Sequence, residues 1–182
     1  MKKIITILVA GVMVFSLAAC GETNIVEEEA PVPAEDVGIA NPWSEVSTPT
    51  EAAQGAGVED LVLLENGTET SGGRVDFDSY QYMEGIAQAN GYIGVADLTV
   101  RKGLKKEGEN ISGDYTEYAY GWTQDVDGIQ VSCSGNEEGK VMNAVWDTDN
   151  YSYSMIVRGQ GDIFDTYGID AEAVSALVIA IQ

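Results

Sequence analysis

The chain has 182 residues, with 30 acidic and 9 basic side chains and no histidine, so its formal net charge is −21. An acidic chain repels the phosphate backbone, and we therefore expect no binding to nucleic acid. The absence of imidazole excludes Ser-His-Asp and Cys-His hydrolysis, as well as histidine-containing zinc sites.

The first 19 residues are typical of a lipoprotein signal peptide. Two lysines precede an apolar run over residues 4–15, and Leu17-Ala18-Ala19 then leads to Cys20. The run is shorter than the roughly 20 apolar residues of a permanent membrane span. We expect lipidation of Cys20, because two acyl chains anchor a protein stably where one does not. This predicts a location on the outer face of the cell membrane. The alternative is an ordinary secretory leader cut after Ala18.

Residues 20–57 read as an acidic linker. This stretch contains no lysine or arginine, many glutamates and all four prolines of the chain. Such a composition buries too little apolar surface to fold, so we expect a disordered tether. Trp43 is its one large apolar side chain, and we interpret it as a lone exposed aromatic rather than a docking point.

Residues 58–182 are predicted to form one domain, which is long enough for a single core. Alternating apolar residues and turn signals indicate three pairs of strands. The pairs are 79–89 with 92–102 across Asn90-Gly91, 115–122 with 129–134 across 125–128, and 141–146 with 151–158 across 147–150.

The end of the chain predicts a helix. Asp170 can cap it, and apolar residues recur at helical spacing thereafter, namely Val174, Leu177, Val178 and Ile181. Because the apolar stripe of a helix and one face of a sheet both need cover, we expect an α+β fold. In this fold, an antiparallel β-sheet is covered on one face by the C-terminal α-helix.

Several short motifs occur in an order that is familiar from one family. They are Arg101-Lys102-Gly103, Ile111 to Tyr115, Ala144-Val145-Trp146, Tyr151 to Ser154, and a Gly-Ile-Asp sequence before the terminal helix. Over residues 79–182 the chain resembles an uncharacterised domain of lipoproteins from Gram-positive, clostridia-like bacteria. A similar domain forms the extracytoplasmic part of some anti-sigma factors. The resemblance implies an extracytoplasmic α+β module without established catalytic residues. Without a membrane span or cytoplasmic domain, we expect no direct inhibition of a sigma factor.

The sequence gives little support for a cysteine nucleophile or for a calcium site. Cys133 alternates with apolar residues, so we interpret it as a core residue of a strand rather than a nucleophile. The acidic pairs Asp125/Asp127 and Asp147/Asp149 place oxygen atoms as a calcium loop would. Both pairs lack the third ligand of an EF-hand, so we interpret them as hairpin turns and expect no metal or cofactor.

Aromatic and basic residues give two further candidate sites. Tyr118, Tyr120 and Trp122 are spaced by two, so one face of a strand would carry all three rings. An open face would bind sugar rings or an extended peptide, whereas a face turned to the helix would be core, which we favour. Four basic residues gather in 101–106, where an anion site and a solvated hairpin end are the alternatives; we favour the latter.

The sequence therefore favours a membrane-anchored extracytoplasmic lipoprotein that acts as a non-enzymatic binding or interaction module at the cell envelope. Its expected partners are the membrane, through the anchor on Cys20, and an envelope protein or cell-wall glycan. The alternative is an envelope hydrolase or cation-dependent enzyme that uses carboxylates. A tyrosine-lined groove would favour binding, and a cleft with converging carboxylates would favour an enzyme.

Overall fold

A computed structural model describes residues 41–164 and 166–181 of the chain. The predicted signal peptide and most of the predicted linker lie outside these residues. The elements in chain order are β1 (Ser44–Val46), α1 (Pro49–Ala56), β2 (Thr68–Thr70), β3 (Gly73–Met83), β4 (Ile86–Ile93), β5 (Ala96–Leu104), β6 (Tyr120–Val126), β7 (Ile129–Gly135), β8 (Asn143–Asp147), β9 (Tyr151–Arg158), a short 3-10 helix (Gly161–Ile163) and α2 (Ala171–Ala180).

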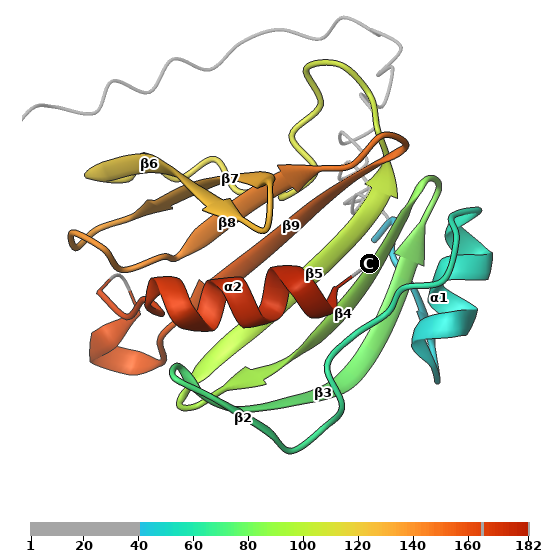
Figure 1. The fold of residues 1–182 in the computed structure, drawn as a ribbon. Helices are drawn as coiled ribbons and strands as arrows, with labels where there is room; N and C mark the ends of the chain where they lie inside the picture. The colour runs from blue at the N-terminus through green and yellow to red at the C-terminus, as the bar shows by residue number, and fades with distance from the viewer. Residues whose placement is uncertain (1–40, 165, 182) are drawn as a thin grey trace, which may run out of the picture. The chain divides into compact units, whose positions relative to one another are not determined.

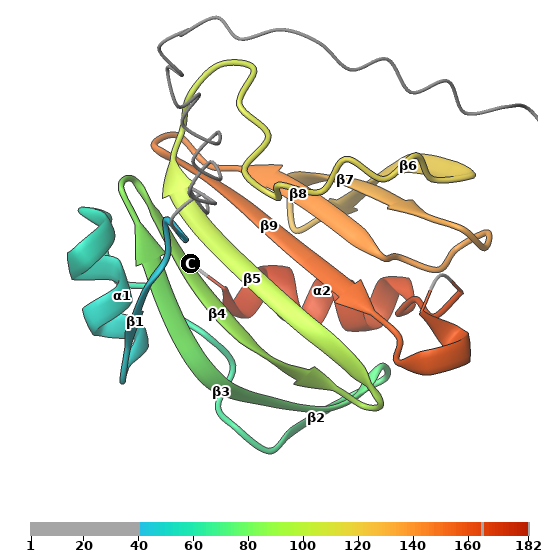
Figure 2. The same ribbon diagram turned by 180° about the vertical axis from the view of Figure 1, so that it is seen from behind.

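The described strands form one nine-stranded sheet with the order β1-β3-β4-β5-β9-β8-β7-β6, and β2 also pairs with β3. All of these pairings are antiparallel. Figure 1 shows α2 lying across one face of the sheet, and Figure 2 shows the other face. A largely antiparallel sheet with a C-terminal helix confirms the α+β class. No helix in the described part of the chain is long and apolar enough to cross a membrane.

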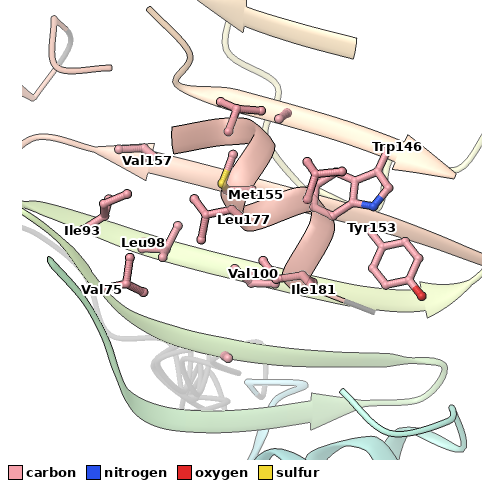
Figure 3. Packing of buried hydrophobic residues seen from close by; sticks show 14 of the residues in the cluster. Val75, Ile93, Leu98, Val100, Trp146, Tyr153, Met155, Val157, Leu177 and Ile181 are labelled. Carbon is pink, nitrogen blue, oxygen red and sulfur yellow. The ribbon is translucent and has the colours of Figure 1, made fainter. Parts of the chain in front are cut away.

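Alternation along the central strands places apolar side chains under α2. Pairing of β5 with β9 sets Leu98 opposite Val157 and Val100 opposite Met155, and all four side chains are fully buried. The apolar stripe of α2 packs onto these strands, as Leu177 and Ile181 do in Figure 3. Every stripe residue that the sequence predicted is buried, namely Val174, Leu177, Val178 and Ile181.

The helix α2 begins where the sequence predicted. Asp170 has an extended backbone, and its carboxylate accepts a hydrogen bond of 2.9 Å from the backbone N–H of Ala173. This bond satisfies one of the free donors at the helix N-terminus. The Asp170 carboxylate also accepts a bond from the Ser71 hydroxyl, which ties the start of α2 to the turn between β2 and β3.

The fold begins earlier in the chain than the sequence analysis expected. Within the range 20–57, where we predicted a linker, residues 44–46 form β1 and residues 49–56 form α1. Thr48 caps α1, and its buried face consists of small residues, Ala52, Ala53 and Ala56. Trp43 is also not alone, because its ring lies 5.0 Å from the guanidinium of Arg101. A row of alanines is a weak apolar pattern from which to predict a helix, although such small side chains let a helix approach a sheet closely.

The predicted turn at Asn90-Gly91 is wrong. Both residues lie inside β4, and the adjacent two-residue turns fall at 84–85 and 94–95. Gly91 serves a close approach instead, since a Cβ atom there would lie 2.0 Å from the carbonyl oxygen of Asp76. The pairing of β3 with β4 shifts register beside this point, between Phe77 and Ser79. The glycine therefore fits a bulge, which has the same residue preference as a turn.

On the face of the sheet opposite α2, the side chain of Arg101 makes several hydrogen bonds. Arg101 donates from Nε to Gln88 at 2.6 Å, and its Nη1 donates to the backbone carbonyls of Ile111 and Ser112. These bonds hold the loop between β5 and β6 against the sheet. Residues 115–119, which we predicted to be part of a strand, belong to this loop, and β6 begins only at Tyr120.

Candidate functional site

The three aromatic residues predicted to share one strand face do not do so. Tyr120 and Trp122 lie on β6 and face the same side as α2, whereas Tyr118 precedes the strand. Trp122 packs partly against the core, while 45% of Tyr120 remains exposed. The expectation of a core position therefore fits Trp122 better than Tyr120.

Tyr118 instead completes an ion pair on the opposite face. The Arg158 guanidinium lies 5.5 Å from the Tyr118 ring and donates to Asp114 at 2.6 Å. The Tyr118 hydroxyl also donates to Asp114. Burial raises the pKa of Tyr118, and this hydrogen bond raises it further, to about 12. Burial also opposes ionisation of Asp114, but bonds from Thr116, Tyr118 and Arg158 outweigh it and lower its pKa to about 2. The cluster holds a loop in place.

Cys133 lies on β7 as a buried free thiol, as predicted. Burial raises the pKa of the thiol to about 11, which keeps it protonated at neutral pH. Cys20, the predicted lipidation site, lies outside the described residues.

Each acidic pair has one member near the end of a strand and one in the turn that follows. The Asp125 carboxylate accepts bonds from the backbone N–H of Gly128 and from the Gln130 side chain, which fixes the turn between β6 and β7. Asp147 ends β8, and Asp149 follows in the next turn. Among the described residues, no group of three or more cysteine and acidic side chains is placed to hold a metal ion.

A concave site with a buried ionisable group lies at the end of α2. We call it the Lys102 pocket; its volume is about 580 Å³. It is lined by Glu59, Lys102, Asp127, Ile129, Trp146, Thr148, Asp149, Asn150, Tyr151, Tyr153, Val178, Ile179 and Ile181. A neighbouring hollow of about 640 Å³ on β7 and β8 shares part of this wall but contains no buried ionisable group.

Lys102 is the unusual residue of the Lys102 pocket. It alternates with Leu98 and Val100 on the apolar face of β5, and only 3% of it is exposed. Its Nζ donates to the backbone carbonyl of Asp60 at 2.8 Å and lies 4.5 Å from the centre of the Tyr151 ring. None of the ion pairs among the described residues includes Lys102. Burial lowers its pKa, and the carboxylates of Glu59 and Asp60 oppose this shift.

Aromatic rings form one wall of the Lys102 pocket. Trp146 and Tyr153, on paired strands, stack with their ring centres 5.4 Å apart, as Figure 3 shows near Ile181. Both rings are nearly covered, with 2% and 3% of each residue exposed. Tyr151 is more accessible, and its hydroxyl accepts a bond from the backbone N–H of Glu59 at 3.4 Å. The wall combines apolar ring surface with polar groups at its edge.

Sequence analysis missed the Lys102 pocket. It grouped Lys102 with three other bases as one solvated hairpin end, but Lys102 and Arg101 lie on opposite faces of β5. Lys105 and Lys106 instead form exposed ion pairs with Asp147 and Glu109. The available signal was a lysine in phase with Leu98 and Val100, because a charged residue on an apolar strand face needs specific partners.

A scan against protein-family models and searches of curated proteins and solved structures find no match to this chain. The resemblance to the lipoprotein domain therefore stays a prediction.

Proposed function

We propose that this protein is a lipid-anchored, non-enzymatic binding module on the outer face of the cell membrane. Its leader and Cys20 support the anchor, and the acidic residues before β1 support a tether between anchor and domain. The binding site in this proposal is the Lys102 pocket, and the ligand is a segment of cell-wall glycan.

The observation that carries the proposal is the tyrosine-lined wall beside a buried lysine. Ligand sites are concave, with mostly apolar walls and a few convergent polar groups, and the Lys102 pocket has these properties. Tyr151 supplies accessible ring surface, while the Lys102 amine supplies a hydrogen-bond donor. A tyrosine-lined wall favours a binding module, whereas the carboxylates of the same pocket are the groups that the alternative, an envelope hydrolase, would use.

The charges of the Lys102 pocket disfavour an anionic ligand. Three carboxylates, from Glu59, Asp127 and Asp149, line it together with one ammonium group. The carboxylates outnumber the ammonium group, so the pocket repels a strongly anionic ligand. A sugar ring presents apolar C–H faces to the aromatic rings and hydroxyl edges to the charged groups.

Calorimetric titration of the purified lipoprotein in detergent with soluble cell-wall glycan fragments tests the site. We expect saturable binding that Tyr151→Ala weakens by about tenfold, or 1.4 kcal/mol. The matched control is Tyr92→Ala, which removes a half-exposed tyrosine from the opposite face of the sheet. Absent binding, or equal affinity of the Tyr151→Ala protein, would overturn the assigned site.

Membrane fractionation tests the anchor. We expect Cys20→Ser to release the protein into the medium or to leave its leader uncut, since no thiol would remain to accept the diacylglyceryl group. Unchanged detergent partitioning of the variant, or a free thiol at Cys20 in the native protein, would refute lipidation.

A further inference from the structure

The two edges of the sheet differ in how far other parts of the chain cover them. At one end, the outer edge of β3 is covered along its length. β2 pairs with 73–75, the Asn66 side chain bonds both the N–H and the carbonyl of Phe77, and β1 pairs with 80–82. At the other end, β6 pairs only with β7 among the described residues. A strand of seven residues thus has one uncovered edge.

The turn after β6 fixes which backbone groups lie along this free edge. Asp127 and Gly128 both have positive φ angles, 51° and 87°, and they connect the directly paired Val126 and Ile129. In such a two-residue turn the flanking residues exchange hydrogen bonds, and the bonding direction alternates along the strand. The groups of residues 120, 122, 124 and 126 therefore point to β7, and those of Gly121, Thr123 and Asp125 point outward.

Most of the usual devices that block a strand edge are missing from β6. The strand contains neither proline nor lysine, and its register with β7 is continuous, without a bulge. Its one charged side chain, Asp125, is held by the turn through bonds from Gly128 and Gln130. Natural proteins normally protect an exposed edge by such devices, so an unprotected edge indicates a surface for strand pairing.

A hollow at the start of β6, between this strand and the turn after β7, supplies side-chain specificity. Its volume is about 340 Å³, and it is lined by Tyr120, Gly121, Trp122, Glu138 and Gly139. Two aromatic rings and a carboxylate are the groups that bind a lysine or arginine side chain, through cation–π contact and charge. The segments next to the hollow add Glu117 and Glu137, with one base, Lys140, in the turn after β7.

We propose that β6 binds an extended, basic segment of another envelope protein as an additional strand of the sheet. The backbone groups of Gly121, Thr123 and Asp125 would pair with the segment. A lysine or arginine of the segment would occupy the hollow between Tyr120, Trp122 and Glu138. Strand addition of this kind takes affinity from main-chain bonds and specificity from pockets for alternate side chains. A second copy of this chain fits less well, because its net charge of −21 repels an acidic edge.

Fluorescence anisotropy with two labelled nonapeptides tests this pairing on the full protein in detergent. One peptide alternates valine with lysine, and the other replaces each lysine by glutamate. We expect saturable binding of the lysine peptide and binding of the glutamate peptide that is weaker by at least about tenfold. Glu138→Gln should weaken the lysine peptide severalfold, whereas Tyr151→Ala in the Lys102 pocket should leave its affinity unchanged.

Thr123→Pro removes an outward N–H while leaving the bonds to β7 in place, so the protein should stay folded and lose the peptide. Thr123→Val is the matched control, since it retains the N–H and should bind as the native chain does. A lysine peptide methylated on alternate backbone nitrogens blocks pairing from the other side and removes any dependence on the folding of the proline variant. The proposal would be overturned if the methylated peptide bound as tightly as the unmethylated lysine peptide, or if the protein preferred the glutamate peptide. It would also be overturned if the lysine peptide did not bind, or if the protein formed a dimer through β6 that excluded the peptide.

Discussion

The two faces of the sheet use the same strands but are stabilised by different forces. Under α2, alternate side chains such as Leu98 and Met155 are apolar and fully buried. On the other face, Arg101 and Arg158 bind the loop between β5 and β6 through directed hydrogen bonds. Apolar burial does not require a particular orientation of the side chains and does not depend on pH. The hydrogen bonds of an arginine require a particular geometry, and its ion pair requires an ionised carboxylate. The comparison predicts that mutations and acid will affect the two faces differently.

The largest effect should follow from a charge placed under α2. Leu177→Asp buries a carboxylate without a partner, and we expect a loss of about 5 kcal/mol in unfolding free energy or complete unfolding. Urea denaturation followed by tryptophan fluorescence measures the change. Ile179→Asp introduces the same charge at a half-exposed position of the same helix and should be tolerated far better. Similar losses in both variants would show that α2 does not form the core.

On the opposite face, removing one partner of the shielded ion pair should have the next largest effect. Arg158→Met leaves Asp114 with only 6% of its side chain exposed and without its cation, and we expect a loss of about 3 kcal/mol. Arg74→Met breaks an exposed pair with Asp76 and should leave the melting temperature almost unchanged. Equal stability of the Arg158→Met protein and the native protein would show that the ion pair between Arg158 and Asp114 does not stabilise the fold.

Acid should weaken the opposite face selectively. The pKa of Asp114 is about 2 in the folded chain, below the ordinary value of 3.8, so its ionised form favours folding. This contribution, about 2 kcal/mol, is present above pH ~4 and is lost as the pH falls toward 2. Denaturant midpoints between pH 6 and pH 2.5 should therefore fall less steeply for Asp114→Asn than for the native chain. Parallel profiles would show that Asp114 is not the responsible group.

The smallest effect concerns α1, the second helix on the apolar face. Its cap, Thr48, accepts a bond from the Glu51 backbone N–H at 3.2 Å, and Thr48→Ala should lower stability by about 1 kcal/mol. Thermal melting of the full chain measures it, with Thr50→Ala, an exposed residue inside the helix, as the control. No difference between the two variants would place α1 outside the cooperative fold.

Regular periodicity made part of this fold predictable. Spacing by two located β9 at the predicted bounds of 151–158, and helical spacing located α2 with its cap at Asp170. These signals are local, because each side chain reports the face on which its own residue lies. A hairpin leading into Ile129 was also predicted, but its turn is Asp127-Gly128 rather than 125–128, and β6 covers 120–126 rather than 115–122.

Long-range contacts caused the failures. Gly91 is small because the carbonyl of Asp76 approaches it, and the sequence around Asn90-Gly91 does not report that contact. Tyr118 belongs with Arg158, which lies 40 residues away in the sequence, so spacing by two with Tyr120 was misleading. The Lys102 pocket required the positions of three separate turns and the end of α2, which no local pattern supplies.

The contact between Trp43 and Arg101 has a mechanical consequence if Cys20 carries the anchor. Trp43 makes this contact just before β1, which makes three residue pairs with β3. Tension between membrane and domain would therefore load a short peripheral strand before it reached the buried centre. The domain could yield at β1 and lengthen its tether while β6, at the far end of the strand order, stayed intact.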